Sequence, residues 1–114
     1  MSEHIVVTWT MIRDRLEQHE ESIKKNMDYW RKNAEHFKLK SIRYFAQALG
    51  GYSYHYGRVL VFEFETLNDW KAFVTHIEEN KKAFALKEQW LECVDAKTLR
   101  IIEWQERQRE AWLE

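Results

Sequence analysis

The chain has 114 residues, which is the size of one ordinary domain. Its 18 basic and 19 acidic residues give a net charge of −1, which argues against a nucleic-acid partner whose phosphates must be neutralised. With 45% hydrophobic residues the chain is too apolar to be disordered, yet no apolar run approaches the roughly 20 residues of a membrane span. The first residues lack the basic region of a signal peptide, and the single cysteine, Cys93, cannot form an internal disulfide. We therefore expect a cytoplasmic protein with neither a membrane nor a nucleic acid as partner.

The first predicted element is a strand over residues 4–12, HIVVTWTMI. This segment is β-branched and aromatic, and it contains neither Gly nor Pro. Its two alternating faces are both nearly free of charge: Ile5, Val7, Trp9 and Met11 on one, Val6, Thr8, Thr10 and Ile12 on the other. We expect a strand that is covered on both sides.

A long amphipathic helix is predicted over residues 14–37, with Asp14 capping its start. The apolar stripe that indicates it consists of Leu16, Ile23, Met27, Trp30, Ala34 and Phe37. The same pattern places His19 and His36 on the polar side of the helix, facing solvent.

Two further strands are predicted over residues 39–49 and 58–65, separated by Gly50-Gly51 and a loop or hairpin over 52–57. A Gly-rich connection between two strands is typical of an antiparallel hairpin. The faces of the later strand alternate between Leu60, Phe62 and Phe64 and the set Val59, Val61, Glu63 and Glu65.

The remaining elements are a helix capped by Thr66, an interruption at residues 78–80, a helical piece over 81–93 and a strand over 98–104. The complete order predicts an α+β, ferredoxin-like βαββαβ fold, a four-stranded antiparallel sheet with helices on one face. We expect a single domain over residues 1–104 and a charged tail over 105–114.

The helices leave the other face of this sheet uncovered, and the first and third strands give that face several apolar residues. A homodimer that packs sheet against sheet would cover it, and twofold dimers are the commonest oligomers. We therefore expect the chain to be its own partner.

The order of elements, together with VLVFEFETLNDWKAFVTHIEENKKAFALKEQWLECVDAKTLRIIEW, resembles the dimeric α/β-barrel proteins, in particular their NIPSNAP-like and antibiotic-biosynthesis-monooxygenase-like branches. This resemblance implies a barrel cavity that binds a small, partly apolar or aromatic molecule. It also implies that the protein could act on this molecule as a minor monooxygenase or isomerase. The alternative is a non-catalytic structural homodimer with a closed core.

The resemblance does not extend to the haem-degrading members, which use Asn on the first strand, Trp on the third and His on the late helix. Here the first strand offers Thr8 and Thr10, the third offers Glu63 between two phenylalanines, and residues 83–89 contain no His. We expect no haem and no other cofactor.

Five residues are candidates for a ligand site: Arg43, Tyr44, Glu63, His55 and His76. Arg43 and Glu63 lie on neighbouring predicted strands, where they form either a structural ion pair or a ligand site. In a ligand site, Arg43 would anchor a carboxylate, with Glu63 or His76 accepting a proton. His55 lies between two tyrosines, which suits a cavity mouth or packing across strands.

The five histidines show no spacing that would place two imidazoles on one ion, so we expect no metal. Trp30, Trp70 and Trp90 are predicted core residues, whereas the face of Trp9 depends on strand register. The acids beside Cys93 favour an inert thiol.

Overall fold

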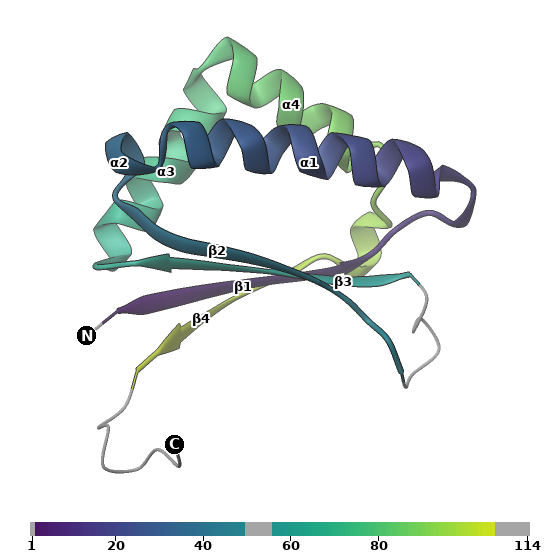
Figure 1. Ribbon diagram of the computed structural model, residues 1–114, viewed down its shortest axis with the longest axis horizontal. Coiled ribbons are helices and arrows are strands. Elements are labelled where there is room, and N and C mark those ends of the chain that lie inside the picture. The colour runs from purple at the N-terminus through teal and green to yellow at the C-terminus, as the bar shows by residue number, and fades with distance from the viewer. Residues whose placement is uncertain (1, 50–55, 107–114) are drawn as a thin grey trace.

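The computed structural model describes residues 2–49 and 56–106. Its four strands form one sheet in the order β2-β3-β1-β4, with every neighbouring pair antiparallel (Figure 1). The elements are β1 Glu3–Thr10, α1 Leu16–Lys32, α2 Ala34–Phe37, β2 Leu39–Ala46, β3 Gly57–Phe64, α3 Leu67–Glu79, α4 Lys81–Leu91 and β4 Arg100–Gln105, with short 3-10 turns at Arg13–Arg15 and Ala96–Thr98. The predicted ferredoxin-like α+β fold is confirmed.

All the helices lie on one face of the sheet (Figure 1). The helix face carries Ile5, Val7 and Trp9 from β1, and each of them is buried. We call the opposite side the open face; its cross-strand pairs include Val6 with Val61 and Val6 with Ile102. Neither of the described segments covers the open face with a helix, so its apolar residues remain partly exposed.

The predicted helix over 14–37 is two helices, and its predicted cap is wrong. Asp14 lies in the 3-10 turn, and α1 begins after Arg15 without a side-chain cap. The helix ends at Asn33, whose Nδ2 donates to the carbonyl of Tyr29 at 2.8 Å. This side-chain bond competes with helix continuation and explains the break. Across the described residues, no helix is long and apolar enough to cross a membrane.

The hairpin and the second helical region agree with the prediction. β2 pairs with β3 in antiparallel register, and the Thr66 hydroxyl accepts a bond from the Asp69 amide at the start of α3. Asn80 separates α3 from α4, and its side chain caps α4 through the Ala83 amide. The predicted loop over 52–57, except for its last two residues, and the tail from residue 107 onward lie outside the described residues.

Aromatic rings fill the space between the helices and the sheet. Phe73 on α3 is 2% exposed. Its ring lies within 6 Å, centroid to centroid, of five others: Trp30, Phe37, Phe62, Phe64 and Trp70. Because such a close-packed group cannot collapse into a deleted volume, Phe73 is the residue on which the core depends most.

Replacing Phe73 with Ala should lower the free energy of unfolding by about 3–5 kcal/mol, since the cavity adds to the lost burial. Phe84→Ala is the matched control, because Phe84 is 39% exposed on the neighbouring helix. It should cost about 1 kcal/mol or less. Urea unfolding at one fixed protein concentration measures both, and equal losses would contradict this description of the core.

Candidate functional site

A partly enclosed cleft of about 280 Å³ lies between the helix face of the sheet and helices α1, α3 and α4. Its walls are almost entirely apolar, and they include Trp30, Leu60, Phe62, Trp70, Ile77 and Trp90. Small-molecule sites in proteins are typically concave and apolar with a few polar groups, and this cleft approaches their lower size limit of about 300 Å³. It has room for a molecule of one or two rings.

Few polar groups contribute to this cleft. Asn26 lines it, but its Nδ2 already donates to the carbonyls of Ser22 and Leu86, both at 2.9 Å. The Nε1–H of Trp90 is buried and has no hydrogen-bond partner among the described residues. A buried donor without an acceptor carries a desolvation cost that a ligand oxygen would remove. Among the lining residues, Trp90 therefore carries a buried donor that a ligand oxygen within its reach would satisfy.

An ion pair joins the two helices at this cleft. Lys87 Nζ of α4 lies 2.6 Å from Glu78 Oε1 of α3, and both residues are among those that line the cleft. The Glu78 side chain is half exposed, so solvent weakens this attraction. The two charges therefore mark the polar end of an otherwise mostly apolar cleft.

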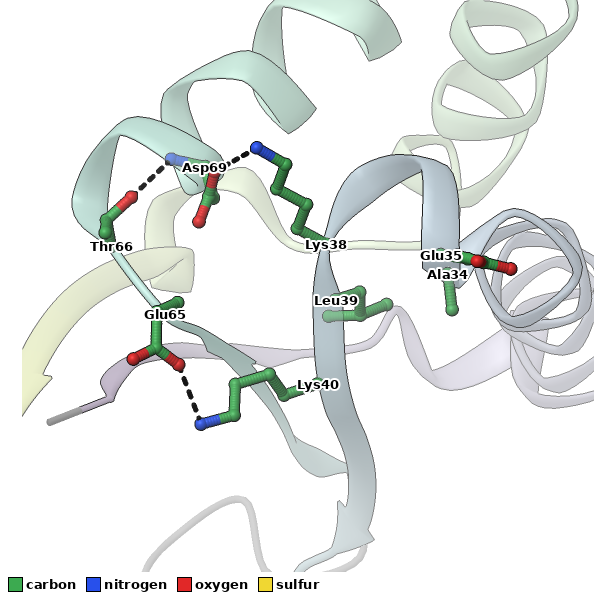
Figure 2. Close-up of a pocket in the computed structure, with 8 residues that line it drawn as sticks. All are labelled: Ala34, Glu35, Lys38, Leu39, Lys40, Glu65, Thr66 and Asp69. Atoms are coloured by element: carbon green, nitrogen blue, oxygen red, sulfur yellow. Dashed lines mark hydrogen bonds and ion pairs between the residues drawn. The ribbon is translucent and has the colours of Figure 1, made fainter.

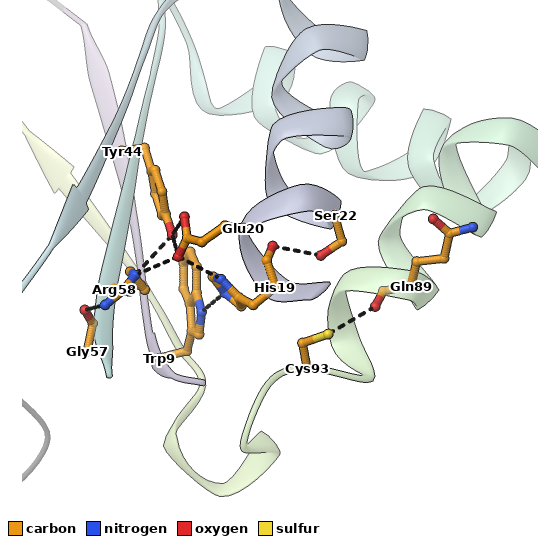
Figure 3. A network of polar contacts seen from close by, with 9 residues as sticks. All are labelled: Trp9, His19, Glu20, Ser22, Tyr44, Gly57, Arg58, Gln89 and Cys93. Carbon is orange, nitrogen blue, oxygen red and sulfur yellow. Dashed lines mark hydrogen bonds and ion pairs between the residues drawn. The ribbon is translucent and has the colours of Figure 1, made fainter. Parts of the chain in front are cut away.

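A partly buried polar network joins the start of α1 to the helix face of the sheet (Figure 3). Trp9 Nε1–H donates to His19 Nε2 at 2.8 Å, and His19 Nδ1 lies 3.2 Å from Glu20 Oε1. The Glu20 carboxylate also accepts bonds from Tyr44 Oη at 3.0 Å and from Arg58 Nε at 3.1 Å. These five residues come from α1 and from three different strands, so the network ties the start of α1 to the sheet.

The geometry of the network fixes the state of His19. An indole N–H can only donate, so His19 Nε2 must accept; the proton then resides on Nδ1 and is donated to Glu20. His19 is 0% exposed, and its burial lowers the pKa of the imidazole, an effect that the nearby Glu20 carboxylate opposes. Burial also raises the pKa of Tyr44, with the charge of Glu20 adding to it. At neutral pH, His19 and Tyr44 are both uncharged.

Trp9 connects this network with the cleft. Its ring meets the Trp90 ring edge to face, with centroids 4.9 Å apart, and lies nearly parallel to Tyr44 on another side. Trp9 is 2% exposed and has little room to move. The register that the sequence left undetermined thus places Trp9 on the helix face, where it supports the cleft wall.

A larger hollow of about 640 Å³ lies on the surface, where α2 and β2 meet the start of α3 (Figure 2). Its two lysines already face carboxylates: Lys40 Nζ is 3.1 Å from Glu65, and Lys38 Nζ is 4.0 Å from Asp69. Because it is open to solvent and its charges are paired, we consider it a weaker site than the smaller, partly enclosed cleft.

The predicted site residues do not form one cluster. Arg43 and Glu63 lie on the open face, because Arg43 opposes Val61 in the register. Tyr44 lies on the helix face, in the network. His76 is on α3, where its Nε2 lies 2.8 Å from the hydroxyl of Tyr29. The fifth candidate, His55, lies outside the described residues.

The expected ion pair between Arg43 and Glu63 is not formed. Glu63 instead accepts a bond from Ser41 Oγ at 2.9 Å and lies 3.7 Å from Lys40 Nζ. The one-residue bulge between Leu39 and Ser41 places Arg43 opposite Val61, on the same face as Glu63, but Ser41 and Lys40 already occupy the Glu63 carboxylate. Burial alone would raise the pKa of Glu63, but hydrogen bonds from Ser2 and Ser41 and nearby positive charge lower it below its usual value.

His19 is not exposed as predicted, although His36 is. Sequence spacing contained the signal, because His19 lies four residues before Ile23 and therefore extends the apolar stripe of α1. Arg58 carries a similar signal, since it alternates with Leu60 and Phe62 on the buried face of β3. Trp30 is buried in the core as predicted, whereas Trp70 and Trp90 are partly buried and pack against it. Cys93 is buried, which raises the pKa of its thiol.

One group could in principle hold a metal ion. Ligand atoms of His4, Glu63 and Glu106 lie within 4.8 Å of one another. Lys40 is already present beside them: its bond to Glu65 raises its pKa, with further attraction from Glu63 and Glu106. Because this ammonium group neutralises the acids and would repel a second cation, we do not regard the group as a metal centre.

Comparison with models of protein families found no match, and comparison with curated proteins found none either. Solved structures do match the fold. A protein from Bacteroides thetaiotaomicron, provisionally assigned as an antibiotic biosynthesis monooxygenase, is similar with a TM-score of 0.70 and 13% identity over 99% of this chain and 96% of its own. A protein from Bordetella bronchiseptica with the same assignment has a TM-score of 0.68 and 9% identity over 94% and 98%.

A third similar structure is a dimeric protein of unknown function and ferredoxin-like fold from Bacteroides fragilis. Its TM-score is 0.66, with 13% identity over 92% of this chain and 96% of its own. At these identities the likenesses establish the ferredoxin-like fold of the chain, and function must be argued from the site.

Glu20→Ala should lower the free energy of unfolding by about 1–2 kcal/mol, because Arg58, 7% exposed, would lose a carboxylate partner, while the 40% exposure of Glu20 lets solvent screen the pair. Glu21→Ala is the control one residue along α1, where Glu21 pairs with Lys25 on the surface. It should cost about 0.5 kcal/mol or less. Chemical denaturation compares the two, and a loss for Glu20→Ala no larger than that for Glu21→Ala would contradict a structural role of the network.

Proposed function

We propose that this protein binds a small, partly apolar or aromatic molecule in the cleft between the helices and the sheet, and that it does so as a homodimer. The cleft itself is the observation that carries the proposal. A protein with a closed structural core, the alternative reading, would fill this space with side chains, as interiors normally are filled. The cleft of about 280 Å³ favours a ligand instead.

The chemistry of the cleft indicates the kind of molecule. Aromatic walls favour a flat, apolar ligand, and the unpartnered Nε1–H of Trp90 favours one oxygen acceptor on it. A phenol, an aryl ketone or a similar compound of one or two rings has both features.

We propose binding rather than a particular reaction. Of the residues that line the cleft, only Glu78 and Lys87 carry side chains that gain or lose a proton readily, and they are paired with each other. Monooxygenase or isomerase chemistry would need a group placed to move a proton at the ligand. Two similar structures are assigned as monooxygenases, which makes oxygenation the first activity to assay once a ligand is known.

Filling the cleft should abolish binding. Val74 lines the cleft, whereas Thr75 beside it on α3 is exposed and does not. Val74→Trp should therefore remove binding of the probe 2-naphthol, and Thr75→Trp should leave it unchanged. Titration followed by NMR chemical shifts measures both affinities. Binding that survives in Val74→Trp, or is absent from the wild type, would overturn the proposed site.

The open face supports the homodimer. Its apolar residues include Val6, Val61 and Ile102, with Phe45 and Trp104 at least half exposed beside them. An apolar sheet face of this kind is normally covered by a partner. The similar structure from Bacteroides fragilis is described as dimeric, which agrees with a second copy as the cover.

A charge on the open face should dissociate the dimer. Ile102 lies on that face opposite Val6, whereas Ile101 faces the helices opposite Val7. Ile102→Lys should give a particle of about half the wild-type mass, and Ile101→Lys, equally polar and also on β4, should remain dimeric. Sedimentation equilibrium distinguishes them. A monomeric wild type would refute the homodimer.

A further inference from the structure

We propose that His19 is a positioning residue for the cleft: its neutral imidazole holds the Trp9 ring against the Trp90 ring. Protonation of His19 then weakens the binding of an aromatic ligand in the cleft. The proposal rests on the function proposed above and adds its regulation. It assigns a role to the partly buried network, which has no direct contact with the ligand.

Trp9 is held from three sides. Its Nε1–H is fixed by His19 at 2.8 Å, its face lies against Tyr44 with ring centroids 6.3 Å apart, and it meets Trp90 edge to face at 4.9 Å. Trp90 lines the cleft, and its own Nε1–H has no partner among the described residues. No hydrogen bond within that part of the chain therefore fixes the indole ring of Trp90, and its orientation depends on packing, including its contact with Trp9.

Protonation of His19 removes the acceptor on which Trp9 depends. The added proton binds Nε2, so that two N–H donors would face each other at 2.8 Å. One of the two side chains must then move. Because the interior is close-packed, a displaced Trp9 displaces Trp90 as well, and the wall of the cleft changes.

The groups around His19 decide when this happens. Glu20 of α1 faces Nδ1 and favours the charged imidazole, while Arg58 of β3, bonded to the same carboxylate, opposes it. Tyr44 of β2 is neutral, since its pKa is raised, and β1 contributes only the indole of Trp9. Burial outweighs these charges and places the pKa of His19 below its ordinary value of 6.5.

The sign of the effect follows from this shift. The unfolded chain binds more protons than the folded chain below pH 6.5, so the contribution of His19 to stability is present above that pH and is lost as the pH falls. If the ligand prefers the neutral state, the linkage is reciprocal: acid weakens ligand binding, and the ligand lowers the pKa of His19 further.

The test is the affinity for 2-naphthol, which is uncharged at both pH values used, about 7.5 and about 5.5. Wild-type affinity should be lower at the lower pH, where a larger fraction of His19 is protonated. His19→Gln should remove this dependence, because a Gln amide can accept from Trp9 and donate to Glu20 without titrating. His36→Gln, which changes an exposed histidine of α2, should keep the wild-type profile. An affinity independent of pH in the wild type, or unchanged pH dependence in His19→Gln, overturns the proposal.

A second measurement needs neither a ligand nor a variant. The indole N–H signals of Trp9 and Trp90 in the NMR spectrum of the wild-type protein should shift together as the His19 ring nitrogens titrate. If 2-naphthol fails to bind at any pH, the proposed function fails, while a joint shift still supports coupling between His19 and the wall. A Trp90 signal that does not move when His19 titrates overturns the coupling.

Discussion

The arrangement of this protein depends on one constraint: the central strand β1 is apolar on its helix face and carries no Asp, Glu, Lys or Arg on its open face. Ile5, Val7 and Trp9 require the helices on one side, and Val6 leaves an apolar neighbourhood on the other. One chain of this length supplies helices for only one of these faces (Figure 1). We therefore propose different tasks for the two faces, a cleft for a small molecule on the helix face and association with a second copy on the open face.

Polar groups on the helix face make the cleft possible. Arg58 and His19 would be costly to bury alone, but Glu20 pairs with the guanidinium and accepts from the imidazole. In turn, His19 satisfies the indole N–H of Trp9, which supports Trp90. The network therefore has two consequences: it anchors the start of α1 on the sheet, and it sets the shape of one wall of the cleft.

Element order and alternation were enough to predict the fold. The faces of β3, the Thr66 cap and the break at Asn80 follow from local patterns that tertiary packing did not override. The Arg43–Glu63 ion pair is not formed because Ser41 and Lys40 already occupy the Glu63 carboxylate. Strand alternation shows which residues share a face, but it does not show which of several neighbours an acid will choose.

The candidate site was harder to predict, because its residues act across the fold. His19 was predicted to be exposed because its side chain is polar, but it is buried. Its spacing of four residues from Ile23 already places it in the apolar stripe of α1. The partnership of Glu20 with Arg58, 38 residues apart, exists only once α1 lies on β3. An unpartnered indole such as that of Trp90 can be recognised only from three-dimensional packing.

The central claim is that the two faces of the sheet differ in what they bind. Nuclear Overhauser contacts between 2-naphthol and the methyl groups of the protein test it directly, since each face carries its own aliphatic residues. The account predicts contacts to Leu60, Val74 and Ile77, which line the cleft. Contacts to Val6, Val61 and Ile102 instead would place the ligand on the open face and contradict it.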